Sequence, residues 1–469
     1  MRPSSSATLA LLAAAALAAC SDRDVSRVDP TPDQVDEWSI EVTPNRDLDI
    51  LFVVDNSGSM AGEQASLAAN FPAFMGVLQT IAGGLPNVHI GVVSSNVGSA
   101  GQASVPGCAG QGDDGKLLVR AGCGGLTGAF ISDVADVAGG RVKNYAGNLD
   151  TLFSCMAQLG TTGCGFEMHL ESMYRALQPD ANPGFYRPDA YLAVIIIADE
   201  DDCSTEVGTM FGDPTAGLGS PLGPRTSFRC FEFGVACDDD PDPRAFGTKR
   251  GCRSRPSSPY MYEVEKYVAF LRGLKSDPRL VMVAGIVGVD DDQHTVVVGP
   301  DPTTPTNPSV QKSCFIADPG DPDDGAAPPI RIGEFLRSFG NHTQTSICSA
   351  TLEDALLQIA DRLKTVLYDP CLRRPLADGD PIRPGPQYQC AVADVLDPHA
   401  DSRRETVIPA CADNGTTAPC WRITPDVDQC PATAGNPDSL AIDVVRGDVT
   451  PPANTFLEVQ CVVAQPSDP

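Results

Sequence analysis

The chain has 469 residues, and its 33 Lys and Arg residues stand against 61 Asp and Glu residues, which gives a formal net charge of −28. A surface this acidic repels the phosphate backbone, so a basic nucleic-acid-binding protein is disfavoured. Apolar residues make up 42% of the chain, enough for a packed core, which argues against disorder throughout. Neither a Cys-x-x-Cys pair nor a His-Glu-x-x-His motif occurs, so the usual zinc-ribbon, thioredoxin-like and zincin motifs are missing.

Residues 1–19 predict an export signal. A short apolar run rich in Leu and Ala covers residues 8–19, too short to cross a bilayer as a helix, and ends in Leu17-Ala18-Ala19-Cys20. This motif resembles the bacterial lipobox. The resemblance implies that Cys20 carries lipid, and Ser21 after it favours the outer membrane. We therefore expect a protein of the bacterial cell envelope that is held to the membrane by its lipid anchor only.

The polar, proline-containing segment 20–46 predicts a flexible tether. From residue 47 to 368, continuous apolar strands alternate with helical patterns. The strands are expected near 49–55, 88–94, 191–198, 280–289 and 345–349, and the helices near 61–81, 148–159, 166–177, 262–274, 330–339 and 352–367. This alternation predicts an α/β fold with a doubly wound, mainly parallel sheet flanked by helices.

Two segments depart from this pattern. Residues 203–259 are polar, rich in Gly and Pro, and contain four Cys residues, which predicts a disulfide-stapled insertion. Residues 369–469 contain six Cys residues, many Pro residues and short alternating pieces. We interpret this last segment as a small, disulfide-held β module.

Polar side chains follow the first buried strand in Asp55-Asn56-Ser57-Gly58-Ser59-Met60, directly before a helix. Ligands of an open parallel sheet bind beyond the carboxyl ends of its strands. Asp55, Ser57 and Ser59 can place one carboxylate and two hydroxyls around a single point. Oxygen ligands of this kind suit Mg²⁺ or Mn²⁺, and also Ca²⁺. With little negative charge from its ligands, the ion would keep an open coordination position.

At these residues the sequence resembles the von Willebrand factor A domain and its metal-ion-dependent adhesion site. The family's threonine, in a Thr-x-x-Gly setting, matches Thr162, with Thr161 as the alternative. Its fourth-strand aspartate matches Asp199, although Glu200 stands where the family usually has Gly. The resemblance implies direct ligation by Ser57, Ser59 and Thr162, and ligation mainly through water by Asp55 and Asp199. It also implies that a partner protein supplies a carboxylate to the sixth position.

If Cys20 carries lipid, 16 of the 17 Cys residues remain, an even number that allows eight disulfides. We expect short loops closed by Cys155–Cys164, beside Thr162, and by Cys108–Cys123. The other pairings stay open.

The leading functional prediction is therefore a non-enzymatic, lipid-anchored envelope protein that binds another protein through Mg²⁺ or a related divalent cation. One alternative is a structural envelope component in which the ion only stabilises the fold. Another is a metal-assisted hydrolase, for which no general base is fixed by spacing. His169 follows the threonine loop closely enough to approach the site, but we assign it a packing or surface role. The run Asp199-Glu200-Asp201-Asp202 is interpreted as a solvated acidic segment rather than a second cation site.

Overall fold

The structure is a computed structural model. It describes residues 35–41, 46–81, 84–100, 102, 105, 107–136, 140–239, 242–275, 277–316, 324–367, 370–380, 382, 385–396, 403–412, 418–427, 430, 432–447 and 455–464. The predicted signal segment and the lipidation site Cys20 lie outside the described residues. The chain divides into two compact units: residues 45–367 form one, and residues 1–44 together with 368–469 form the other.

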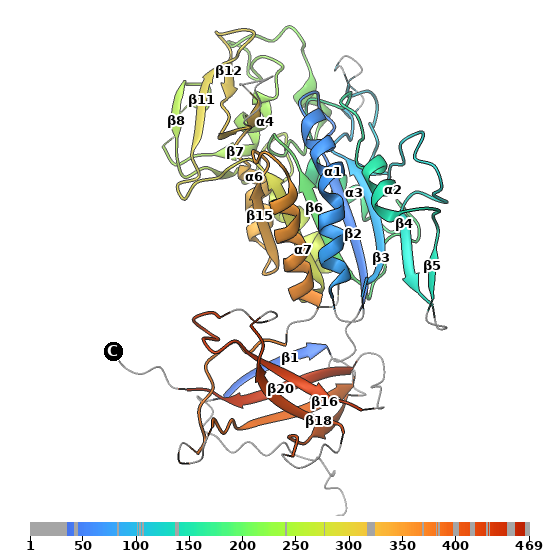
Figure 1. Cartoon of the computed structure of the whole chain (residues 1–469). Coiled ribbons are helices and arrows are strands. Elements are labelled where there is room, and N and C mark those ends of the chain that lie inside the picture. Colours follow the sequence, from blue (N-terminus) through green and yellow to red (C-terminus); the bar gives the residue numbers. More distant parts are fainter. Residues whose placement is uncertain are drawn as a thin grey trace, which may run out of the picture. The chain divides into compact units, whose positions relative to one another are not determined.

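A seven-stranded sheet forms the centre of the larger unit (Figure 1). Its order is β15 (His342–Ser346), β10 (Val281–Val287), β6 (Tyr191–Ile197), β2 (Asp47–Val54), β3 (Asn87–Ser94), β4 (Ile131–Ala135) and β5 (Arg141–Lys143). The first five strands in this order run parallel, whereas β4 pairs with β3, and β5 with β4, in antiparallel fashion. The prediction of an α/β fold with a mostly parallel sheet is thus confirmed.

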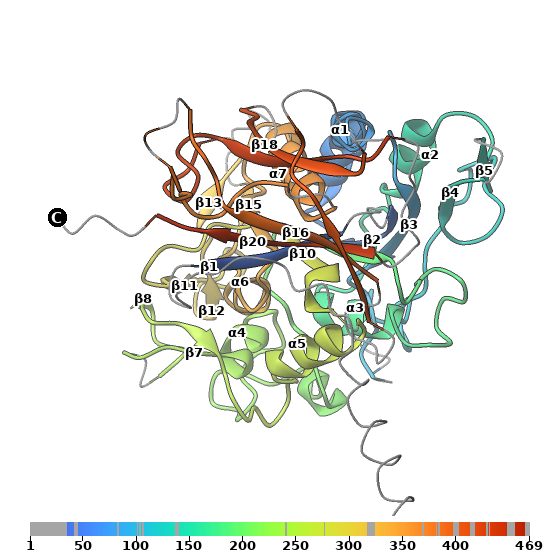
Figure 2. The same cartoon turned by 90° about the horizontal axis from the view of Figure 1, so that it is seen from below.

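Helices cover both faces of this sheet (Figure 2). On one face lie α1 (Ala61–Gln79), α2 (Leu149–Met156) and α7 (Glu353–Leu367); on the other lie α3 (His169–Ala176), α5 (Val264–Gly273) and α6 (Ile330–Arg337). Strand β2 shows why: Ile50 and Phe52 pack into the first core, and Leu51 and Val53 into the second. Because successive side chains of a strand point to opposite faces, a continuous apolar run can be buried on both sides.

The predicted insertion at 203–259 forms a small sheet with strands from a later part of the chain. Within it, β8 (Gly247–Lys249) pairs with β11 (Val296–Pro300), which also pairs with β12 (Pro308–Val310). A small three-stranded sheet therefore joins the insertion to the acidic segment after β10. The sequence did not predict this pairing, because the partner strands lie some fifty residues downstream and leave no local periodic signal. Helix α4 (Phe228–Gly234) also belongs to this layer.

Eight disulfides are present, as the count of Cys residues allowed. Both predicted pairings were wrong. The same four residues form Cys108–Cys164, which joins two loops 56 positions apart, and Cys123–Cys155, which joins a loop to helix α2 over 32 positions. Spacing along the chain misled the prediction because the disulfide geometry depends on which Cα atoms the fold brings within reach.

The smaller unit is built from β strands. A four-stranded antiparallel sheet contains β1 (Val35–Glu41), β20 (Thr455–Val462), β16 (Cys390–Leu396) and β17 (Arg404–Ile408). Strands β18 (Cys420–Pro425) and β19 (Leu440–Val445) form a separate pair, and three disulfides bind the unit: Cys371–Cys430, Cys390–Cys461 and Cys411–Cys420.

Strand β1 corrects the prediction that the whole of 20–46 is a flexible tether, because its residues 35–41 pair with β20 near the other end of the chain. Within the part of the chain that the structure describes, no helix combines the length and apolar character needed to cross a membrane.

Candidate metal centre

The chain leaves the middle of the large sheet in two directions. From β2 it continues to β3 and β4 on one side, and from β6 it continues to β10 and β15 on the other. The carboxyl ends of β2 and β6 therefore flank the point at which an open α/β sheet binds its ligands. Asp55 follows β2 directly and Asp199 follows β6 after one residue. The fold thus brings together two predicted ligands that are 144 positions apart in the sequence.

The loop after β2 arranges three of the predicted side chains. Asp55 is fully buried, and its Oδ1 accepts a hydrogen bond of 2.7 Å from the backbone N–H of Ser57. The hydroxyl oxygens of Ser57 and Ser59 lie 3.2 Å apart. A hydrogen bond from Ser59 to Asp199 joins this loop to the end of β6. Asp55, Ser57, Ser59 and Asp199 consequently form one contiguous polar group, with Ser59 exposed at its outer side.

The loop that carries Thr162 lies against this group. Gly163 N–H donates a 2.8 Å hydrogen bond to the carbonyl of Asn56. Gln64, on α1, donates from Nε2 to the carbonyls of both Asp55 and Gly160, at 2.8 and 3.0 Å, and accepts from Gly160 N–H. The backbone of the threonine loop is therefore fixed to the end of β2. Thr161 is partly exposed and Thr162 exposed, so the choice between the two hydroxyls stays open.

The disulfide Cys108–Cys164 ties a third loop to this position. Gly107 precedes it with a φ of +73°, and a Cβ there would lie 2.2 Å from the carbonyl oxygen of Gly163. Glycine is thus required by both the backbone conformation and the close approach of the two loops.

Gly163→Ala should weaken cation binding, because a Cβ at this position would lie 2.1 Å from Asn56 Oδ1 and force the threonine loop away. Overpacking of this kind costs about 1–3 kcal/mol. The control is Gly165→Ala, where the nearest atom to an added Cβ is 3.9 Å away. Isothermal titration with Mg²⁺ should show a larger dissociation constant for the first variant only; equal effects of both variants would contradict the assignment.

Buried carboxyl groups surround the site on its inner side. Burial, followed by repulsion from Asp55 and Glu200, raises the pKa of Asp199 well above its ordinary value. Burial and the neighbouring Glu200 and Asp55 likewise raise the pKa of Glu167. The pKa of Glu200 is raised by burial and by Asp55, although a hydrogen bond with Glu167 opposes the shift. Burial and the close spacing of these carboxyls thus disfavour their ionised forms, a cost that a bound cation would relieve.

Three carboxylate oxygens in this region have no hydrogen-bond partner among the described residues: Asp55 Oδ2, Asp199 Oδ1 and Glu63 Oε2. Their residues are at most 6% exposed. Asp55 Oδ2 faces His169 Nε2 at 3.4 Å, whereas no such ion pair is present among the described residues for the oxygens of Asp199 and Glu63. Buried polar atoms are nearly always paired, so these two oxygens are the ones that a further ligand would satisfy.

His169 lies closer to the site than we expected from its sequence position. It is fully buried, and its Nε2 lies 3.4 Å from Asp55 Oδ2, yet neither ring nitrogen makes a hydrogen bond within the described structure. Burial by itself would lower the pKa of His169, but the Asp55 carboxylate raises it above the ordinary value. The first turn of α3 thus presents an imidazole to Asp55.

The sequence analysis did not single out Gln64 or Glu167. Neither belongs to a motif, and only the packing of α1 and of the segment before α3 brings them to the ends of β2 and β6.

The oxygen atoms present fit a hard divalent cation. Hydroxyls of Ser57 and Ser59, with carboxylates of Asp55 and Asp199 behind them, match the ligand preference of Mg²⁺, Mn²⁺ and Ca²⁺. Elsewhere, too, the described ranges contain no group of three or more His, Cys, Asp or Glu residues arranged to hold a metal ion by themselves.

No family model matches the chain, and no curated protein matches it. Among solved structures, the pilus adhesin SpaC from Lactobacillus rhamnosus GG matches at 11% identity and a TM-score of 0.32, over 92% of this chain and 43% of its own. The conserved hypothetical protein BatB from Bacteroides thetaiotaomicron matches at 10% identity and a TM-score of 0.25, over 68% of this chain and 98% of its own. The pilus adhesin RrgA from Streptococcus pneumoniae matches at 10% identity and a TM-score of 0.24, over 93% of this chain and 59% of its own. This chain thus spans less than half of the SpaC chain, and TM-scores this low establish neither a shared fold nor a shared function.

Proposed function

We propose that this protein is a lipid-anchored component of the bacterial cell envelope whose larger unit, a von Willebrand factor A-like domain, binds another protein through a divalent cation. Ser57, Ser59 and one threonine of the 161–162 pair would hold the ion directly. Asp55 and Asp199 would act mainly through water. When bound, the ion would supply positive charge to a carboxylate of the partner.

The observation that carries this proposal is the layered arrangement of ligands at the carboxyl ends of β2 and β6. The unpaired oxygens of Asp55 and Asp199 lie in the interior, whereas Ser59 and Thr162 are exposed. A cation between these two layers would be attracted from behind by carboxylates and reached from outside by a partner. Neutral hydroxyl ligands on the outer side would leave it electrophilic toward an acidic side chain.

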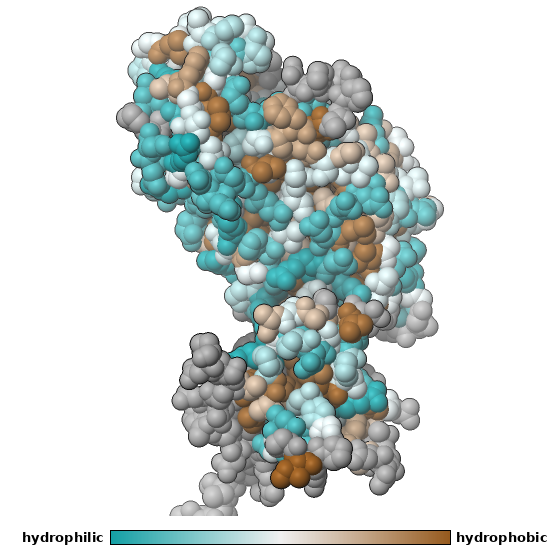
Figure 3. Space-filling view, turned by 60° about the vertical axis from the view of Figure 1, so that its left-hand side comes forward, coloured by the Kyte–Doolittle hydropathy of each residue, from teal (hydrophilic) through white to brown (hydrophobic). Residues whose placement is uncertain are grey.

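Two further features support an envelope protein. Eight disulfides are typical of an oxidising compartment. On the face seen in Figure 3, the described residues are mainly hydrophilic, and the apolar areas are small and separate.

The test uses cells that carry the full chain and compares their attachment to one another and to matrix with Mg²⁺ and with EDTA. We expect chelation to release attached cells and Asp55→Ala to have the same effect with Mg²⁺ present, because both remove the attraction for the partner's carboxylate. The double variant Ser57→Ala/Ser59→Ala should also lose attachment in the presence of Mg²⁺, although it keeps the buried carboxylates. The control is Asp180→Asn, an exposed residue beyond the far end of α3.

Attachment that resists EDTA and all these substitutions would contradict the adhesion proposal. If EDTA then lowered only the melting temperature, the alternative of a structural protein stabilised by its ion would remain. The hydrolase alternative requires an enzymatic turnover that Asp199→Ala abolishes.

A further inference from the structure

A pocket of about 100 Å³ opens beside the candidate metal centre. Its lining comes from three parts of the larger unit: the loop after β6, helix α4 of the insertion, and the segments around β11, β12 and the start of α6. The pocket and the metal centre share the loop after β6. Ala327, which lines the pocket, donates its N–H to the carbonyl of Asp199 at 2.8 Å, and Glu200 lines the pocket directly after Asp199.

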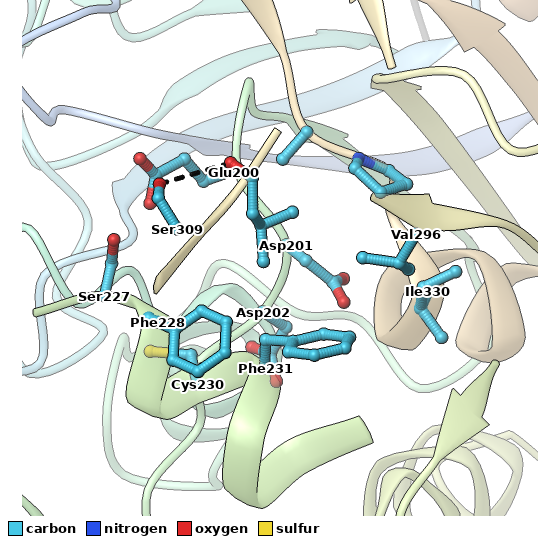
Figure 4. A pocket seen from close by; sticks show the side chains of 13 residues that line it. Glu200, Asp201, Asp202, Ser227, Phe228, Cys230, Phe231, Val296, Ser309 and Ile330 are labelled. Carbon is cyan, nitrogen blue, oxygen red and sulfur yellow. Dashed lines mark hydrogen bonds between the residues drawn. The ribbon is translucent and has the colours of Figure 1, made fainter. Parts of the chain in front are cut away.

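The walls of the pocket combine apolar surface with acidic groups. Figure 4 shows the rings of Phe228 and Phe231, on α4, on one side, and Glu200 and Ser309 on another. Val296 and Ile330 add aliphatic surface, and Asp201 and Asp202 belong to the lining as well. Such a pocket can hold an aliphatic stem against aromatic rings while a polar head reaches a carboxylate.

The charge of the lining favours a cationic occupant. Three lining residues are acidic, and none of the lining residues is basic. Asp202 is paired with the fully buried Arg331, and Asp201 accepts hydrogen bonds from the backbone N–H groups of Arg331 and Ile332. Lys312 does not belong to the lining, although its charge acts on Glu200. Of the three lining acids, Glu200 is the one outside the Arg331 network, so it is the group that a cationic side chain in the pocket would meet.

We propose that this pocket is the second contact of the same partner and takes one of its Lys or Arg side chains, so that the protein recognises an acidic residue and a nearby basic residue together. The inference rests on the proposed function, since the acidic residue is the one that meets the cation. The aliphatic stem would pack on Phe228 and Phe231, and the charged head would lie near Glu200. Because Asp199 and Glu200 are consecutive, the two partner residues would lie close together in space.

The test is selection from a library of displayed peptides that contain one fixed Asp among random residues. The full chain is the bait, binding takes place with Mg²⁺, and bound peptides are eluted with EDTA. We expect Lys or Arg to be enriched at a fixed distance from the Asp. Ser309→Lys supplies the pocket with its own cation, so this variant should lose the enrichment of basic residues by at least tenfold yet still select Asp-dependent, EDTA-eluted peptides.

Thr306→Lys is the matched control, because it adds the same charge at an exposed position of the β11–β12 turn outside the pocket lining. It should select the same basic residues as the wild type. Enrichment of apolar residues, or of none, near a required Asp would overturn the pocket proposal and leave the cation proposal intact. Selection of no peptide that depends on both Asp and Mg²⁺ would overturn the proposed function, and the pocket proposal with it.

Discussion

Magnesium should raise the melting temperature of the wild-type protein, and Asp199→Asn should abolish that rise. Any ligand that binds only the folded state stabilises it, by about 2.7 kcal/mol at a concentration one hundred times its dissociation constant. In the wild type, the buried Asp199 lies close to the carboxylates of Asp55 and Glu200, which oppose its ionisation when no cation is present. Asp199→Asn removes one of these carboxylates and with it a proposed ligand of the ion.

The variant should therefore melt no lower than the wild type in EDTA, and lower than the wild type in Mg²⁺. A variant that is less stable than the wild type only in Mg²⁺ identifies a cation site. Loss of an ordinary structural carboxylate would instead lower the melting temperature in both buffers. Differential scanning calorimetry with and without Mg²⁺ measures both values. Asp180→Asn, which removes the same charge from an exposed position, should leave the magnesium shift unchanged. A wild type that Mg²⁺ does not stabilise would contradict the metal centre.

Arg331→Met should lower the free energy of unfolding by about 3–5 kcal/mol, since it leaves a buried carboxylate without its counter-charge. Arg331 and Asp202 are both fully shielded from solvent, and Arg331 Nη2 lies 3.1 Å from Asp202 Oδ2. The same guanidinium donates to the carbonyl of Tyr262 at 2.9 Å and to Ser254 Oγ at 3.3 Å. It thus holds α6, the insertion and the loop after β6 in one network.

Chemical denaturation of the single and double variants measures this effect. Adding Asp202→Asn to Arg331→Met should recover part of the lost stability, because the uncompensated charge is then gone. The comparison is Arg279→Met: Arg279 is 54% exposed and pairs with Asp277, so its loss should cost less than about 1 kcal/mol. Equal losses of unfolding free energy in the two arginine variants would contradict the prediction that the buried Arg331 pair contributes more than an exposed one.

Patterns of neighbouring residues predicted the central elements well. Continuous apolar runs gave β2, β3, β6 and β10 within a few residues, because a strand buried on both faces needs apolar side chains at every position. The helical patterns gave α1, α5, α6 and α7 in the same way. By contrast, β8 and β1 were missed because each takes its place from pairing partners far away in the chain.

The candidate site shows the same division. The string Asp55, Ser57, Ser59 could be recognised because its spacing and its place after a strand are local facts. Gln64, Glu167 and His169 could not be assigned to the site in this way, since they reach it from helices and loops whose packing the sequence does not display. The disulfide partners of Cys108 and Cys155 were wrong for the same reason.

The sequence by itself determined the alternation of strands and helices, the acidic charge, the large number of cysteines and the oxygen-bearing loop after the first sheet strand. These depend on residue type and short-range periodicity, which a single chain displays directly. Only the tertiary structure decided that Asp199 meets that loop, that His169 lies against Asp55, and that an acidic and aromatic pocket opens beside them. Such contacts join residues far apart in the chain, and they arise only when the two faces of the sheet are packed.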